Sequence, residues 1–145
     1  AKNGERGAIR FPRARFRNDS YEFSFSGIKT AVWHYLKAPA ATTSRQEDIA
    51  ASFQEAVVDM LVQPAVRAAR NTGVERIVLS GGVAANSRLR AKMKEKAGAE
   101  NIETFFPAHK FCTDNGAMIA LAGYEWLKRG RRAEYGLNAD ADLTL

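Results

Sequence analysis

Two adjacent glycines, which follow a short β-branched run and precede a basic segment, constrain the fold of this chain more than any other feature. Gly81 and Gly82 come directly after Arg76–Ser80, whose composition is typical of a strand. The segment from Asn86 to about Lys96 is rich in helix-forming residues. A strand that turns tightly into a helix is a unit of α/β proteins. We therefore expect Arg76–Ser80 to be a buried strand and the basic segment to be a helix.

Two helices are predicted upstream of this unit. The first extends over about Ile28–Lys37, with Ser26 as its N-cap and Pro39 marking its end. The second begins at Ser44–Glu47, which has the Ser-x-x-Glu form of a capping box.

The second of these helices is the longest and has one apolar face. Pro64 should kink it near Leu61, because proline lacks the amide hydrogen that an uninterrupted helix needs. Asn71–Gly73 should end it. The apolar face repeats at helical spacing and consists of Ile49, Phe53, Val57, Met60 and Leu61.

The remainder of the chain completes an α/β pattern. Ile102–Phe106 is predicted to be a second strand and Met118–Lys128 the last helix. The order is helix-rich and shows two or three strands, few for a complete sheet, so we expect part of a larger unit. We divide the chain into an irregular, surface-lying arm at residues 1–22, a lobe at residues 23–130 and a loop-like tail at residues 131–145.

The composition excludes several classes of protein. No apolar run has membrane-spanning length and no signal-peptide pattern opens the chain, so we expect no membrane association and a cytoplasmic location. The single cysteine, Cys112, excludes an intrachain disulfide and a cysteine-rich zinc site, and we expect it to pack as a small hydrophobe.

The net charge is +6, and the cations form three clusters. Such a surface attracts polyanions such as tRNA at long range. A solvated, solubilising surface explains the same charge, so charge alone does not establish RNA binding. The clusters are Arg10–Arg17, Arg88–Lys96 and Lys128–Arg132.

The segment Cys112–Ala120 places one carboxylate, Asp114, at the start of an apolar helix. A carboxylate held there can bind a metal, and the free backbone amides of a helix N-terminus attract phosphate. An aspartate before a helix is more often simply its N-cap. The spacing alone leaves both interpretations of Asp114 open.

Four ordered stretches together resemble one enzyme family. They are Phe23–Thr30, Glu47–Gln54, Ser80–Arg90 and Cys112–Ala120. In this order they look like the C-terminal half of the tRNA N6-adenosine threonylcarbamoyltransferase (TsaD-type) family, formerly called O-sialoglycoprotein endopeptidase or glycoprotease. The resemblance implies part of an actin-like lobe of the ASKHA, ribonuclease-H-like class. No residues independently indicate a protease.

The resemblance also implies roles for single residues. Asn86 would contact an adenylate substrate, with Gly81 and Gly82 contributing more loosely. Asp114 would be one ligand of a divalent metal, iron or zinc, whose other protein ligands are two histidines of a His-x-x-x-His helix in the N-terminal half. No such motif is present, because the only histidines are His34 and His109. We therefore expect the isolated chain to be inactive.

The implied reaction transfers a threonylcarbamoyl group from threonylcarbamoyl-adenylate to N6 of the adenosine beside the anticodon in tRNA. The implied partners are tRNA, a paralogous TsaB-type subunit and a TsaE-type ATPase, and ATP or the adenylate is the implied nucleotide. No residue of the sequence can be identified as the general base of this reaction. Two alternatives remain, an ATP-binding lobe of a sugar-kinase-like protein and a non-catalytic RNA-binding or assembly module. Lys29 could contact phosphate or be an ordinary exposed lysine.

Overall fold

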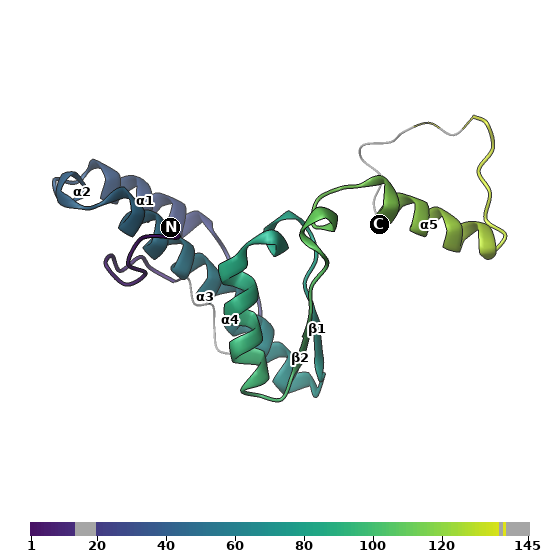
Figure 1. Cartoon of the computed structure of the whole chain (residues 1–145), viewed down its shortest axis with the longest axis horizontal. Helices are drawn as coiled ribbons and strands as arrows, with labels where there is room; N and C mark the ends of the chain where they lie inside the picture. The colour runs from purple at the N-terminus through teal and green to yellow at the C-terminus, as the bar shows by residue number, and fades with distance from the viewer. Residues whose placement is uncertain (14–19, 137, 139–145) are drawn as a thin grey trace. The chain divides into compact units, whose positions relative to one another are not determined.

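The computed structural model describes residues 1–13, 20–136 and 138. The chain divides into two compact units, Ala1–Cys112 and Thr113–Leu145, and each is described here by itself. Figure 1 shows the order of the elements along the chain. They are α1 (Ser26–Lys37), α2 (Ala40–Thr43), α3 (Gln46–Thr72), β1 (Arg76–Val78), the 3-10 helix η1 (Gly82–Ala85), α4 (Ser87–Gly98), β2 (Glu103–Phe105), the 3-10 helix η2 (His109–Phe111) and α5 (Gly116–Lys128).

The first unit contains a parallel pair of strands joined by a helical crossover. β1 pairs with β2 in the register that sets Ile77 opposite Thr104, and α4 connects the two strands. α3 and α4 pack on one face of the pair (Figure 1), where Ile77 contacts the buried Val62 and Met93 cluster. This arrangement confirms the helix-rich α/β class that the order of elements predicted. None of the helices in the part that the structure describes is long and apolar enough to cross a membrane.

The expectation that the first strand is buried is wrong. Val78 is 72% exposed and Phe105, its register partner on β2, is 43% exposed. Side chains alternate between the two faces of a strand, so only Ile77 and Thr104 turn toward the helices. Within the described residues, helices cover one face of this sheet and each strand has one paired edge.

α3 is the centre of the first unit because it contributes to all three apolar clusters. Met60 packs with Phe11 and Ile28, and Val62 packs with residues of α4. The predicted apolar face is largely confirmed, although Phe53 is 36% exposed. α3 runs as one helix through Pro64, and its predicted kink stays a prediction.

The predicted C-terminal ends of the helices agree with the structure better than the predicted N-terminal caps do. Gly73 has a φ of 70° and ends α3, while the Val74 N–H donates to the Ala69 carbonyl at 2.9 Å, a Schellman-type end. α1 ends directly before Ala38 and Pro39, as predicted.

The two predicted N-caps are wrong. Ser26 is the first residue of α1, and Phe25 precedes it without a side-chain cap. The Ser44 hydroxyl bonds to the Tyr35 hydroxyl at 2.6 Å and donates to the Ala40 carbonyl at 2.9 Å, so it ties α2 to α1. Arg45 therefore precedes α3, and its side chain does not cap the helix by a hydrogen bond.

The described residues of the N-terminal arm form no helix or strand, and the arm packs against the core of the unit, whereas the sequence predicted an arm that lies on the surface. Phe11 is 4% exposed and meets the Tyr35 ring edge-on at 5.6 Å. The Ile9 N–H donates to the Ser52 hydroxyl at 3.1 Å. A Cβ on Gly4 would lie 1.9 Å from the Glu47 carbonyl oxygen, so only glycine allows this approach to α3. Residues 14–19 lie outside the described residues.

Candidate functional site

The predicted glycine loop joins β1 to α4 through a backbone that requires glycine. Gly81 has φ 84° and ψ 171°, a region that side-chain-bearing residues rarely adopt. The chain then makes the single 3-10 turn η1 and enters α4 at Asn86. A Cβ on Gly81 would meet nothing within 4 Å, so the backbone of this loop is open to an approaching ligand.

Asn86 is the N-cap of α4, and this accounts for most of its hydrogen-bonding capacity. Its Oδ1 accepts from the backbone N–H groups of Arg88 and Leu89, both at 3.0 Å. Its Nδ2 donates to Gln54 Oε1 on α3 at 3.3 Å. Only one amide hydrogen of Asn86 then remains for a ligand. The role as an adenylate contact stays a prediction, and the geometry limits it to donating a hydrogen bond.

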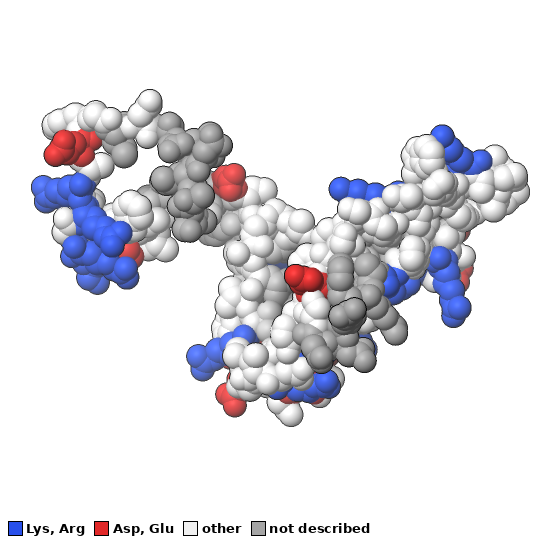
Figure 2. Space-filling view, turned by 180° about the vertical axis from the view of Figure 1, so that it is seen from behind, with Lys and Arg blue, Asp and Glu red and all other residues white. Residues whose placement is uncertain are grey.

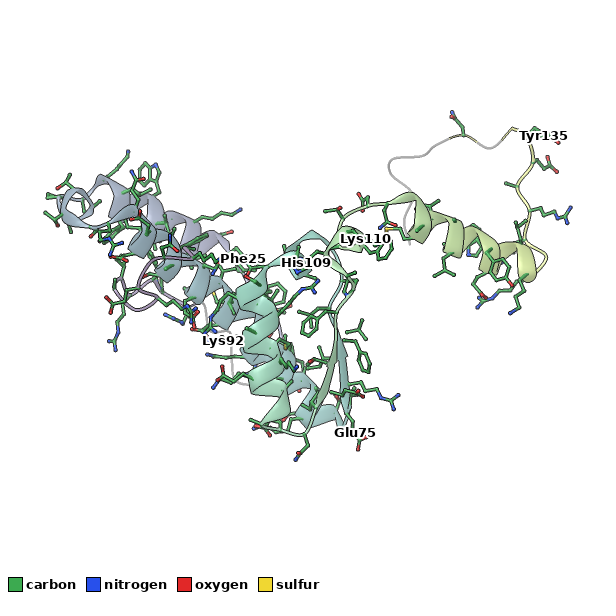
Figure 3. The ribbon with its side chains drawn as sticks, viewed as in Figure 1. Phe25, Glu75, Lys92, His109, Lys110 and Tyr135 are labelled. Carbon is green, nitrogen blue, oxygen red and sulfur yellow. The ribbon has the colours of Figure 1, made fainter. Side chains whose placement is uncertain are left out.

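A network of charged side chains fixes α4 against α3 beside this loop. Arg88 binds Glu55 with two hydrogen bonds, Nε to Oε2 at 2.7 Å and Nη2 to Oε1 at 2.8 Å. Lys92, labelled in Figure 3, binds both Glu55 and Asp59. Arg13 of the arm binds Asp59 at 2.7 Å. Asp59 is 7% exposed, so this network is largely removed from water.

The network shifts the titration of its members. The hydrogen bond from Arg88, helped by Lys92, lowers the pKa of Glu55 from 4.5 to about 2, although burial opposes this. The same hydrogen bond raises the pKa of Arg88. Both effects describe a mutually stabilised ion pair that persists at neutral pH.

Arg90 supports the loop from its other side. Its Nε donates to the Ala84 carbonyl at 2.5 Å and its Nη2 donates to the Pro107 carbonyl at 2.7 Å. The same Nη2 lies 3.0 Å from the sulfur of Cys112, which is 3% exposed and packs as the sequence predicted. The guanidinium therefore joins η1 to the segment that precedes η2.

The expected basic surface at Arg88–Lys96 is wrong for three of its cations. The side chains of Arg88 and Lys92 are 18% and 12% exposed and face acidic partners. Arg90 is half-buried against carbonyl oxygens. Only Lys94 and Lys96 of this cluster are exposed, and Lys96 pairs with the neighbouring Glu95.

An apolar cavity of about 830 Å³ lies beside the glycine loop, between α3, β1 and the start of α1. Its walls include Phe25, labelled in Figure 3, together with Phe53 and Leu61. The volume suits a ligand of nucleoside size. The polar residues that line the cavity are Lys29, Gln54, Ser80 and Asn86.

Asp114 belongs to the second unit and is not the cap of α5. The cap is Asn115, whose Oδ1 accepts from the Met118 N–H at 3.1 Å and whose Nδ2 donates to the Thr113 carbonyl at 2.9 Å. Asp114 is exposed and forms no hydrogen bond or ion pair with the other described residues. Of the two interpretations of Asp114, the N-cap is therefore wrong and the carboxylate is free to bind a ligand.

The described residues do not form a metal centre on their own. Among residues 1–13, 20–136 and 138, no three histidine, cysteine, aspartate or glutamate side chains gather where they could hold an ion. His34 on α1 and His109 on η2 (labelled in Figure 3) are both exposed. Asp114 fits a metal as a single ligand, and the remaining ligands would have to come from elsewhere.

Sequence reasoning missed the acidic side of the network and the contact from Gln54. A signal was present, because Glu55 and Asp59 are spaced i, i+4 on one helix. Arg88 and Lys92 have the same spacing on the next. Each helix therefore presents two like charges on one face, and the two faces are complementary in charge.

Comparisons with known proteins identify the family of this chain. A family model described as tRNA N6-adenosine threonylcarbamoyltransferase (TsaD) matches residues 1–121. The chain is 50% identical over 145 residues to the protein of that name from Thermotoga neapolitana, covering all of this chain and 44% of the relative. It is 51% identical over 142 residues to the one from an Anaeromyxobacter species, covering 97% of this chain and 43% of the relative.

A third relative with the same name, from Clostridioides difficile, is 47% identical over 147 residues and is covered to 44%. The chain thus spans less than half the length of each of these curated relatives. The match nevertheless includes the glycine loop, Asn86 and Asp114. The chain belongs to the tRNA N6-adenosine threonylcarbamoyltransferase (TsaD) family, whose fold is of the actin-like ASKHA type.

Proposed function

We propose that this chain supplies part of an enzyme that transfers a threonylcarbamoyl group from threonylcarbamoyl-adenylate to N6 of the adenosine beside the anticodon in tRNA. The observation that carries this proposal is the identity of about half of all residues, along the whole chain, with proteins named for that activity. In this reaction the adenosine N6 amine forms a bond to the carbamoyl carbon, the bond from that carbon to the phosphate oxygen of the adenylate breaks, AMP leaves, and the amine loses one proton.

The loop from Gly81 to Asn86 is the proposed contact for the adenylate. Its support is an open backbone at Gly81, one uncommitted amide hydrogen on Asn86, and the adjoining apolar cavity. Gln54 fixes the orientation of the Asn86 amide, so the remaining hydrogen points in a defined direction. A preorganised donor loses little conformational entropy when a ligand binds.

Asp114 is the proposed single ligand, from this chain, of an iron or zinc ion. Its support is an exposed carboxylate with no partner among the described residues, next to a helix whose cap is another residue. Such an ion would polarise the carbonyl and phosphate oxygens of the substrate as a Lewis acid. The incomplete ligand set supports the further proposal that these 145 residues alone do not catalyse transfer.

The remaining partners are proposals from the family resemblance. They are tRNA as acceptor, a TsaB-type subunit, and a TsaE-type ATPase, in the cytoplasm. Each concerns the complete enzyme.

A second candidate is a non-catalytic RNA-binding or assembly module, which the incomplete metal centre favours. Titration calorimetry separates the two candidates. We expect the chain to bind ATP in the presence of Zn²⁺, or of Fe²⁺ without oxygen, and Asp114→Ala to abolish the metal-dependent part of that binding.

Glu134→Ala is the matched control, since Glu134 is an exposed carboxylate of the same unit and should leave the titration unchanged. Absence of nucleotide binding in every form, together with retained binding of tRNA, would favour the non-catalytic module. The sugar-kinase-like alternative would require ATP-dependent phosphorylation of a sugar, and the names of the relatives give it no support.

A further inference from the structure

We propose that the segment Lys128–Arg132, called here the basic turn, is a contact surface for the phosphate backbone of RNA. This inference rests on the proposed function, which supplies tRNA as the nucleic acid. It adds a location on this chain for the contact.

The basic turn has the densest group of uncommitted cations in the described residues. Lys128, Arg129, Arg131 and Arg132 fall within five positions, and all four are exposed. None of them forms an ion pair with a described acidic residue. Figure 2 shows Lys and Arg side chains gathered at one end of this unit, at the left of the view. Exposed cations without an acidic partner retain their attraction for phosphate.

The backbone explains why these cations stay together. α5 ends at Lys128, and Gly130 has a φ of 74°, which reverses the chain. The Gly130 N–H donates to the Leu127 carbonyl at 2.9 Å and the Arg131 N–H to the Trp126 carbonyl at 2.9 Å. This hydrogen-bonded turn holds the cations of the helix end beside those that follow the glycine.

A purely structural role explains only part of the group. Cations in the last turn of a helix interact favourably with its carbonyl end, by about 0.3–1 kcal/mol each. That accounts for Lys128 and Arg129. Arg131 and Arg132 follow the turn, and their side chains form no hydrogen bond to a carbonyl of a described residue, so the helix end does not require them.

Aromatic side chains accompany the cations and favour RNA over other polyanions. The guanidinium of Arg131 lies 5.8 Å from the centre of the Trp126 ring, which is 59% exposed. Tyr124 is 59% exposed and lies one helical turn before Lys128. Exposed rings beside phosphate-binding cations can stack on unpaired bases such as those of a tRNA loop.

Binding of unmodified tRNA, followed by fluorescence anisotropy from 50 to 200 mM salt, tests this surface on the chain itself. The test variant replaces Lys128, Arg129, Arg131 and Arg132 by Gln. The control variant replaces four exposed cations of the other unit, Lys2, Arg6, Arg10 and Lys94, by Gln, so the two variants have equal net charge. Circular dichroism of both variants checks that helix content is retained.

We expect the wild-type slope of log K against log salt to fall by about 3 in the test variant, at about 0.7–0.9 per phosphate contact. The control variant should lose less than about 1. Equal losses in the two variants would overturn the proposal, because the attraction would then depend on net charge alone. Absence of tRNA binding by the wild-type chain would overturn it as well.

Two further measurements identify the partner. Vesicles containing 30% phosphatidylserine should bind the chain weakly, and with no difference between the variants; strong vesicle binding that the test variant loses would assign the basic turn to a membrane surface instead. Threonylcarbamoyl transfer is assayed separately, with residues 1–145 placed in the full-length Thermotoga neapolitana relative in exchange for the matching segment. A folded chimera that binds tRNA through the basic turn without any transfer activity would contradict the proposed function and leave this surface intact.

Discussion

The two basic segments at Arg88–Lys96 and Lys128–Arg132 look alike in sequence, but their cations have different surroundings in the structure. In the first, Arg88 and Lys92 turn onto Glu55 and Asp59. In the second, all four cations face solvent without an acidic partner among the described residues. The difference lies in what the neighbouring element carries, because α3 presents carboxylates to α4. A basic run is therefore structural or ligand-binding according to its packing partner.

The largest effect should come from breaking the structural network. Glu55→Ala leaves Arg88 and Lys92 largely buried with one fewer carboxylate, which should lower the free energy of unfolding by about 4 kcal/mol. Urea denaturation measures it. Glu103→Ala is the control, because Glu103 pairs with Arg76 at 3.8 Å on an exposed surface, and it should cost under about 0.5 kcal/mol. Similar losses in both variants would contradict the structural role of Glu55.

Acid should weaken the same network. The pKa of Glu55 is lowered to about 2 in the folded chain from 4.5. The stabilisation is therefore complete above about pH 4.5 and is lost as the pH falls toward 2, by up to about 3 kcal/mol at 1.36 kcal/mol per pKa unit. Denaturation across pH 2–6 should show this loss in the wild-type chain. If the Glu55→Ala variant lost stability as steeply between pH 6 and 2, the loss would have to come from groups other than Glu55.

A smaller effect separates the two roles of Asn86. Asn86→Ala removes the cap of α4 and should cost about 1–2 kcal/mol in unfolding free energy. Asn86→Asp keeps an acceptor for the Arg88 and Leu89 amides, so it should restore most of that stability. Both variants lack the amide donor, and calorimetry should show weakened nucleotide binding in each. Full nucleotide binding by Asn86→Asp would mean that Asn86 acts as a cap alone.

The smallest change in stability should come from the basic turn. Replacing Lys128, Arg129, Arg131 and Arg132 by Gln removes no ion pair with a described residue. The loss should stay below about 1 kcal/mol, the scale of exposed charges and helix-end interactions. Thermal denaturation of this variant beside Glu55→Ala measures the contrast between the two basic segments. If the loss of stability equalled that of Glu55→Ala, the proposed contrast between the two basic segments would be wrong.

The elements of this fold could be predicted because their signals are local. The apolar spacing of α3, the Gly73 stop and the β-branched run before Gly81 each need only neighbouring residues. The N-caps failed because Ser44 has a competing partner in Tyr35. The exposure of Val78 could not be predicted, since it depends on how many strands and helices cover the sheet.

For the candidate site, too, the features that could be predicted are those with a local sequence signal. Asn86, Gly81 and Asp114 could be named from motifs, and the structure adds what each atom is free to do. The contact from Gln54 to Asn86 spans 32 positions and needs the packing of α3 against α4. Pairing of Glu55 with Arg88 required the same tertiary contact, although the i, i+4 spacing of both partners was visible.

The most direct test of the account is threonylcarbamoyl transfer to tRNA by a chimera. Residues 1–145 would replace the matching segment of the Thermotoga neapolitana relative, with which they are 50% identical. The account predicts metal-dependent transfer that Asp114→Ala abolishes and Glu134→Ala preserves, while these 145 residues alone show none. A folded chimera without transfer, or one whose activity survives Asp114→Ala, would contradict it.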